Sequence, residues 1–169
     1  MGKNLELKIK INSDNGIKKK LKGLCKFVGV LNQKDVYYKI DAGLLKLRIQ
    51  NGEYFLIKYL RDETSQKRWS NYEILEISSN NAESFLSSIF EVETIVEKER
   101  KLYMYNNTRI HIDTVKNLGL FIELETVIEK ITEEEGEKEF SEVVEFLNLD
   151  LDKQLKTSYR NLLLNNQYN

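Results

Sequence analysis

The sequence contains no proline and a single cysteine, Cys25, among its 169 residues. One cysteine excludes an internal disulfide and a cysteine-rich zinc site. No apolar run is long enough to span a bilayer, and the first residues lack the hydrophobic core of a signal peptide. The formal net charge is only -1, so nothing points to a general affinity for nucleic acid or for an anionic membrane. We therefore expect a soluble, cytoplasmic protein.

Five stretches place charged residues at every second position, with mostly apolar residues between them. They are Glu6–Lys10, Lys46–Arg48, Lys98–Arg100, Arg109–Asp113 and Glu123–Glu125. Side chains two apart on a strand share a face, so each stretch presents its charges on one side of a sheet. That face combines cations with carboxylates, which a metal-bound polyphosphate requires. An ordinary solvent-exposed face could carry the same pattern.

Hydrophobic periodicity predicts eight strands and several amphipathic helices. The strands are predicted at residues 4–12, 35–40, 44–50, 54–60, 71–77, 93–105, 109–115 and 121–128. Helices are predicted at residues 17–28 and 81–90, and again in a C-terminal helical segment at about 136–165. The Asn51-Gly52 pair is a strong signal for a two-residue hairpin turn. No repeat or linker divides the chain, so we expect one domain, residues 1–169.

Closure would remove the exposed edges of a sheet of this size. The apolar stripes at Ile17–Val28 and Phe140–Leu147 must pack against something. They can do so if the charged face of the sheet points inward and the apolar face outward. The prediction is an α+β fold: a closed antiparallel β-barrel of about eight strands around a polar tunnel, with amphipathic helices packed outside.

Short motifs follow one another along nearly the whole chain. They are Asn4-Leu-Glu-Leu-Lys8, Asp35-Val-Tyr-Tyr38, Leu45-Lys-Leu-Arg48, Leu56-Ile-Lys58, Val96-Glu-Lys-Glu-Arg100, His111-Ile-Asp113, Leu118-Gly-Leu-Phe-Ile-Glu-Leu-Glu125 and Ser158-Tyr-Arg-Asn-Leu-Leu163, with a loop-like stretch from Arg61 to Tyr72. In this order they resemble the CYTH, or triphosphate tunnel metalloenzyme, superfamily, especially its class IV adenylyl cyclase-like branch. The opening signature of that family is Glu-x-Glu-x-Lys, so Asn4 stands where the family has glutamate. An asparagine can coordinate a hard cation through its carbonyl oxygen but adds no charge.

The resemblance implies a site for a triphosphate with Mg²⁺ or Mn²⁺. The implied phosphate-binding residues are Lys8, Lys10, Lys46, Arg48, Lys58, Lys98, Arg100 and Arg109. The implied metal ligands are Glu6, Asp113, Glu123 and Glu125, and the implied catalytic residues are Lys98, Arg100 and Glu123. Arginines would bind phosphate as bidentate forks and lysines as point charges. His111 shares the parity of Arg109 and Asp113 and is expected to line the tunnel without a proton-transfer role.

The resemblance favours a class IV-type adenylate cyclase, which converts ATP into cyclic AMP and pyrophosphate. One alternative is a triphosphatase acting on thiamine triphosphate, tripolyphosphate or a nucleotide, because the same cations and metals would serve either reaction. A non-catalytic nucleotide or polyphosphate binder is a third possibility, motivated by Asn4. Relatives suggest a homodimer. Trp69 and Tyr72 could stack on a base at the tunnel mouth, although ordinary packing is the better interpretation.

Overall fold

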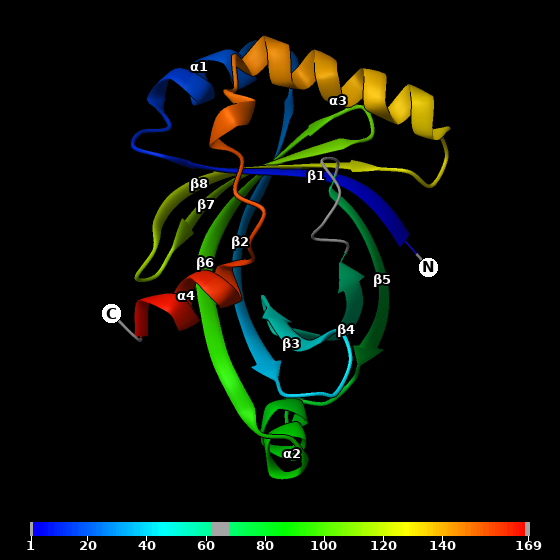
Figure 1. Ribbon diagram of the computed structural model, residues 1–169, viewed down its shortest axis with the longest axis vertical. Coiled ribbons are helices and arrows are strands. Elements are labelled where there is room, and N and C mark those ends of the chain that lie inside the picture. The colour runs from blue at the N-terminus through cyan, green and yellow to red at the C-terminus, as the bar shows by residue number, and fades with distance from the viewer. Residues whose placement is uncertain (1, 62–67, 168–169) are drawn as a thin grey trace.

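A computed structural model describes residues 2–61 and 68–167, without the side chains of residues 2, 59–61, 68–71 and 167. The described strands are β1 (Gly2–Ile11), β2 (Lys26–Tyr38), β3 (Leu44–Gln50), β4 (Glu53–Arg61), β5 (Arg68–Ile77), β6 (Val92–Tyr105), β7 (Thr108–Val115) and β8 (Gly119–Val127). The α-helices in the same ranges are α1 (Asn15–Leu24), α2 (Ala82–Ile89), α3 (Glu133–Leu147) and α4 (Tyr159–Gln167). The predicted α+β class is confirmed (Figure 1). None of the described helices is long and apolar enough to cross a membrane.

The strands form one curled antiparallel sheet in the order β1-β5-β4-β3-β2-β6-β7-β8. β8 also pairs with β1, from Ile11 opposite Leu120 to Asn4 opposite Val127, so the order returns to its first strand. The predicted hairpin joins β3 to β4: Asn51 and Gly52 have φ values of 51° and 88°, and Gln50 pairs with Glu53. Two consecutive positive φ angles are what a two-residue turn between antiparallel strands requires.

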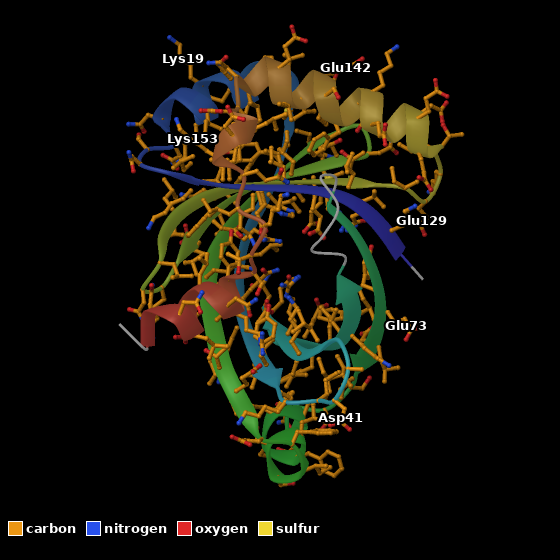
Figure 2. The ribbon with its side chains drawn as sticks, viewed as in Figure 1. Lys19, Asp41, Glu73, Glu129, Glu142 and Lys153 are labelled. Atoms are coloured by element: carbon orange, nitrogen blue, oxygen red, sulfur yellow. The ribbon has the colours of Figure 1, made fainter. Side chains whose placement is uncertain are left out.

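Helices α1 and α3 cover the convex side of the sheet over β1, β7 and β8 (Figure 1). The buried apolar cluster beneath them consists of Leu7, Ile9, Leu21, Tyr103, Ile110, Ile112, Ile122, Leu124, Val143 and Leu147. The charged residues that alternate with this cluster therefore point to the concave side. Lys19 of α1 and Glu142 of α3 face away from the sheet (Figure 2). On these strands the predicted parity, with apolar residues outward and charges inward, agrees with the structure.

Helix α4 departs from the predicted arrangement, because it packs on the concave side. Tyr159 and Leu163 contact the buried apolar residues Tyr37, Val96, Val115, Leu118 and Phe121. Val96 lies two residues before Lys98 on β6, and Phe121 two before Glu123 on β8, so these apolar side chains share the inner face with the charges. This end of the inner face is apolar, which explains why a helix covers it.

The segment before α4 is tied to the first strand. Gln154 forms an isolated antiparallel bridge with Ile9, and the backbone N–H of Leu155 donates to the carbonyl oxygen of Lys8 over 2.8 Å. The C-terminal segment therefore enters the concave side of the sheet at a fixed position on β1.

The largest error in the predicted elements lies between α1 and β2. The predicted helix reached Val28, but α1 ends at Leu24 and β2 begins at Lys26. Residues Lys26–Leu31 pair with Met104–Arg100 of β6, with an irregularity between Phe27 and Gly29. Pairing with a distant strand thus outweighed the local helical spacing.

Candidate active site

The charged side chains of the concave face meet in a cavity of about 200 Å³. It is lined by Asn4, Glu6, Lys8, Tyr37, Lys46, Arg48, Ile57, Tyr72, Ile74, Lys98, Arg100, Arg109, Glu123, Glu125, Ser158 and Tyr159. Six of these residues are cationic and three carry carboxylates. Most come from strands that are distant in sequence, so only the complete sheet brings them together.

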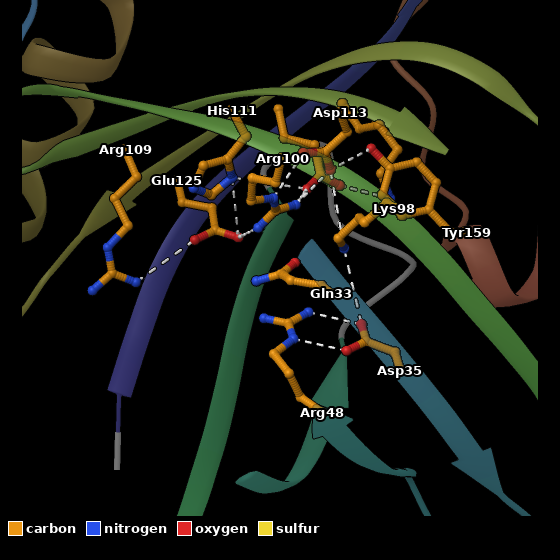
Figure 3. A network of polar contacts seen from close by, with 12 residues as sticks. Gln33, Asp35, Arg48, Lys98, Arg100, Arg109, His111, Asp113, Glu125 and Tyr159 are labelled. Atoms are coloured by element: carbon orange, nitrogen blue, oxygen red, sulfur yellow. Dashed lines mark hydrogen bonds and ion pairs between the residues drawn. The ribbon is translucent and has the colours of Figure 1, made fainter. Parts of the chain in front are cut away.

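Asp35 on β2 anchors one group of cations. Nε and Nη2 of Arg48 donate to the two oxygens of Asp35, each over 2.7 Å, and Nζ of Lys46 donates to Oδ2 over 2.9 Å. Nζ of Lys98 lies 3.9 Å from the same oxygen (Figure 3). Burial alone would raise the pKa of Asp35, but Arg48, Lys46 and Lys98 outweigh burial and hold it well below its usual value. Asp35 therefore stays ionised and fixes Arg48 by a bidentate pair.

Asp113 on β7 fixes Arg100 on β6 by a bidentate pair of the same kind. Nε and Nη2 of Arg100 donate to its two oxygens over 2.7 and 2.6 Å. The hydroxyl of Tyr159 also donates to Oδ2 of Asp113, over 3.1 Å (Figure 3). The aspartate side chain is fully buried. The two oxygens of Asp113 are thus engaged in orienting Arg100 and in holding α4 at the cavity.

Glu123 and Glu125 of β8 face the cavity in front of these pairs. Lys8 lies 3.1 Å from Oε1 of Glu123, and Arg100 is hydrogen-bonded to Oε2. Arg109, whose side chain is 44% exposed at the rim, lies 3.8 Å from Glu125. Burial would raise the pKa of Glu123, but Lys8 and Arg100 hold it well below its usual value, so this carboxylate is ionised.

Two lysines of the cavity are only weakly held in the charged form. Burial, together with neighbouring Arg48, lowers the pKa of Lys46 to about 7. Burial and Arg100 lower the pKa of Lys98 to about 8. Desolvation outweighs the attraction of Asp35 at both positions. An additional anion in the cavity would favour the charged form of both lysines.

His111 of β7 was expected to line the tunnel, but it is not among the described lining residues and lies behind the carboxylates of Glu123 and Glu125. Its Nδ1 atom lies 3.9 Å from Oε1 of Glu125 and 4.0 Å from Oε2 of Glu123. Burial and Arg100 lower the pKa of His111 to about 4, so its imidazole is neutral near pH 7. Among the described residues, nothing forms a hydrogen bond with this Nδ1 atom or with Oδ1 of Asn4, although both atoms are buried. Carboxylate oxygens beside two unpartnered buried acceptors are a donor set that fits a divalent cation.

The family model for the CYTH domain matches residues 2–159. The chain belongs to the CYTH family. Enzymes of the CYTH superfamily are metal dependent, which agrees with the donor set around Glu123 and Glu125.

Several CYTH relatives are similar over nearly the whole chain. A Methanocaldococcus jannaschii protein named "Putative adenylate cyclase MJ0240" is 29% identical, covering 94% of this chain and 97% of its own. The PH1012 structure from Pyrococcus horikoshii is 28% identical with a TM-score of 0.81, covering 94% and 98% of the two chains. A Hippeastrum structure, described as a "putative adenylyl cyclase" with a dominant triphosphatase activity, has a TM-score of 0.63 at 14% identity, covering 88% and 89%. The Hippeastrum likeness shows a shared fold.

The structure brings most of the predicted CYTH site residues to the cavity. They are Glu6, Lys8, Lys46, Arg48, Lys98, Arg100, Arg109, Glu123 and Glu125. Lys10 lies on the same face of β1 as Lys8 but is exposed. It pairs with Phe121 of β8, and its Nζ atom lies 5.9 Å from the centroid of the Phe121 ring. Asp113 lies behind the cavity with both oxygens engaged, so it fits the role of orienting Arg100 better than that of a metal ligand.

The prediction for Lys58 does not fit the geometry. Lys58 is exposed and is not among the cavity-lining residues of the described part of the chain. It pairs with Leu45 of β3, and Leu45 packs with the apolar cluster beneath α2 on the outer face. Residues opposite each other on paired strands share a face, so Lys58 points away from the cavity.

Sequence reasoning gave no role to Asp35 or Tyr159, although both lie in motifs that carried the resemblance. Asp35 is 1% exposed, and its three cationic neighbours come from β3 and β6. Its register could have signalled the role, because Asp35 pairs with Arg48 across the β2–β3 hairpin. Of the predicted loop between Arg61 and Tyr72, residues 62–67 lie outside the described residues, whereas Arg68–Tyr72 belong to strand β5. The side chain of Trp69, for which packing was predicted, is not described, and Tyr72 lines the cavity.

Proposed function

We propose that the cavity binds the triphosphate group of its substrate and catalyses a metal-assisted displacement at phosphorus, with cyclisation of ATP as the leading reaction. The observation that carries the proposal is the convergence of six cations on one cavity beside an ionised, metal-fitting carboxylate pair. A triphosphate carries several negative charges, which the cations match. A purely structural salt-bridge network would not need an open cavity between its members.

The buried aspartates orient the arginines for this task. Arg48 and Arg100 each use Nε and Nη2 on their aspartates. The planar fork is thereby fixed. The remaining edge of Arg100 faces Glu123 and Glu125, and it would bind phosphate oxygens once these carboxylates hold a metal. Pre-oriented donors stabilise charge that develops on the leaving group without a cost of reorganisation at the moment of reaction.

Glu123 and Glu125 are the residues that would hold the metal, with Glu6 on the neighbouring strand opposite Glu125. A divalent ion bound there supplies charge neutralisation and orients the attacking and leaving oxygens. In the structure Glu123 holds Lys8 and Arg100. With a metal bound, Glu123 would hold Lys8 and Arg100 less strongly, and both cations would be able to bind the phosphates. Metal and triphosphate should therefore bind cooperatively.

Two reactions fit this arrangement. The M. jannaschii relative carries an adenylate cyclase name at 29% identity, and the Ser158–Leu163 motif resembles class IV cyclases. In a cyclase the ribose 3′-hydroxyl attacks the α-phosphorus and pyrophosphate leaves. One observation supports the alternative, a triphosphatase in which water attacks the γ-phosphorus: about 200 Å³ is smaller than the roughly 300–1,000 Å³ of whole small-molecule sites. It suits a phosphate chain better than an entire nucleotide.

The test is ³¹P NMR of ATP, and separately of tripolyphosphate, incubated with pure protein and Mg²⁺ or Mn²⁺. Cyclic AMP with pyrophosphate would establish the cyclase, whereas orthophosphate would establish the triphosphatase. Glu123→Gln, which keeps the size but removes the charge, should abolish turnover, while the outward-facing Lys58→Met should not change it. No product from either substrate would refute the enzyme, and tight binding without turnover would then identify a triphosphate binder.

A second test addresses the fixed arginines. Arg100→Ala should weaken triphosphate binding by about 1.5–3 kcal/mol, as for a hydrogen bond to a charged group. Titration calorimetry with a non-hydrolysable triphosphate measures this change, and unaltered affinity would remove Arg100 from the proposed phosphate site.

A further inference from the structure

We propose that Nδ1 of His111 is a direct ligand of the metal, and that this nitrogen makes the site selective for a divalent transition-metal ion over Mg²⁺. The inference rests on the proposed metal dependence of the enzyme. It adds a nitrogen ligand to the carboxylates and it names the class of ion.

The position of His111 behind two carboxylates that line the cavity supports this role. The residue is 3% exposed, and its Nδ1 atom faces the carboxylate of Glu125 (Figure 3). The carboxylate of Glu123 lies at a similar distance from the same atom. Ligand atoms of these three residues lie within 4.8 Å of one another. No hydrogen-bond partner for Nδ1 exists in the described part of the chain. A buried polar atom normally has a partner, so this one requires an explanation.

Direct pairing with the carboxylates does not provide the explanation. The separations of 3.9 and 4.0 Å exceed the 2.7–3.2 Å range of an N–H···O hydrogen bond. Two atoms that each lie about 2.0–2.2 Å from one ion are at most about 4.4 Å apart. The observed separations therefore match ligands facing each other across an ion better than partners in a hydrogen bond.

Asn4 supplies a second orphaned acceptor on the same face. Its side chain lines the cavity, is 5% exposed, and leaves Oδ1 without a hydrogen bond among the described residues. Asn4 pairs with Val127, two residues from Glu125, so Asn4 and Glu125 are diagonal neighbours on the inner face. The donor set then combines the carboxylates of Glu123 and Glu125, with Glu6 opposite Glu125, with a neutral nitrogen and a neutral oxygen.

This composition determines which ion is favoured. Mg²⁺ prefers oxygen ligands and water, whereas imidazole favours the first-row transition metals. A neutral amide at Asn4 in place of a further carboxylate also lowers the electrostatic attraction that a hard ion depends on. The nitrogen ligand should matter little to Mg²⁺ and much to Mn²⁺, Co²⁺ or Zn²⁺.

The chain has one histidine, which makes the test unambiguous. Pulsed EPR of Mn²⁺ bound to untagged full-length protein should show the ¹⁴N coupling of a directly ligated imidazole, and that nitrogen can only belong to His111. Direct Mn²⁺ titration should show about tenfold weaker binding to His111→Gln, with Mg²⁺ affinity changed less than twofold. Lys58→Met, on the outer face, serves as the matched control and should preserve both affinities and the coupling.

The outcomes separate this inference from the proposed function. Bound Mn²⁺ without nitrogen coupling, no Mn²⁺ binding at all, or equal losses for Mg²⁺ and Mn²⁺ in His111→Gln would overturn the ligand assignment. The spectrum of the wild-type protein decides the matter even if the variant does not fold. Nitrogen coupling in a protein that turns over no triphosphate would support the site and refute the proposed enzyme. Turnover of a triphosphate without nitrogen coupling would support the proposed enzyme and refute His111 as a metal ligand.

Discussion

Binding of a triphosphate should draw protons into the cavity at alkaline pH. The cause lies in Lys46 and Lys98, whose pKa values are lowered by burial to about 7 and about 8. At pH 8 a lysine with a pKa of about 7 is protonated in about a tenth of molecules, and one with a pKa of about 8 in about half. An anion beside them favours the charged form and raises both pKa values.

The expected magnitude follows from these fractions. If both lysines become fully charged, each bound triphosphate takes up about 0.9 proton at Lys46 and about 0.5 at Lys98 at pH 8, or about 1.4 in total. At pH 7 the same calculation gives about 0.5 and about 0.1, or about 0.6 in total. Uptake should therefore more than double between pH 7 and pH 8.

Titration calorimetry in two buffers with different ionisation enthalpies measures the number of protons directly. A non-hydrolysable triphosphate analogue would be titrated at a fixed concentration of Mn²⁺. Lys46→Met should reduce uptake at pH 8 to about 0.5 proton, and the difference from wild type cancels any contribution of the ligand itself. Lys19→Met, on the exposed face of α1 (Figure 2), is the control and should leave uptake unchanged. Uptake near zero at pH 8, or equal uptake in wild type and Lys46→Met, would refute the reasoning.

Three further predictions concern single positions. Asp35→Asn leaves the buried cations around it without their counter-charge, so it should lower the free energy of unfolding in urea by about 3–5 kcal/mol. Asp41→Asn, at an exposed site, should lower it by almost nothing. Equal effects of the two variants would contradict the role of Asp35. Lys58→Ala should leave the triphosphate dissociation constant unchanged in calorimetry, and a loss of tenfold or more would place this side chain in the cavity after all. The pKa of His111 is lowered to about 4, so the unfolded chain binds more protons between pH 4 and 6.5 and stability rises with pH across that window. His111→Gln should flatten this rise in urea unfolding at several pH values, and an unchanged slope would argue against a buried neutral imidazole.

The inner face of the sheet could be predicted from sequence wherever charged and apolar residues alternate strictly. On β1, β7 and β8 a period of two fixes which side chains share a face, and the apolar stripes of α1 and α3 decide which face is outside. This reasoning placed Lys8, Glu123 and Glu125 correctly at the cavity. It needed no knowledge of strand order.

Lys58 shows where parity within one strand is insufficient. The Asn51-Gly52 turn sets Gln50 opposite Glu53, so Lys46 lies opposite Ile57 and Lys58 opposite Leu45. Counting residues outward from this turn is enough to place Lys58 on the outer face, because the turn fixes the register of the hairpin. Lys58 was predicted to bind phosphate from the Leu56-Ile-Lys58 motif alone. The register of β4 with β3 places its side chain on the outer face instead.

The side on which α4 packs depends on long-range contacts that the sequence does not reveal. The Tyr159–Leu163 part of that helix packs on residues of four strands of the inner face. Helical spacing predicts that α4 exists, but it does not say which surface the helix covers. The same limit applies to the contact of Asp35 with Lys98 of β6, which only the assembled sheet brings about.

The position of β1 in the sheet has a consequence for how the chain folds during synthesis. β1 is made first, yet its partners are β5, which begins at Arg68, and β8, which ends at Val127, with Gln154 and Leu155 added later. An emerging chain therefore carries a strand with one edge unpaired until β8 is complete at Val127. Long-range pairing of this kind slows folding and exposes a surface that promotes aggregation. The cavity needs Glu123 and Glu125 of β8 and Tyr159 of α4, so truncation from the C-terminal end should remove binding before it removes most of the secondary structure.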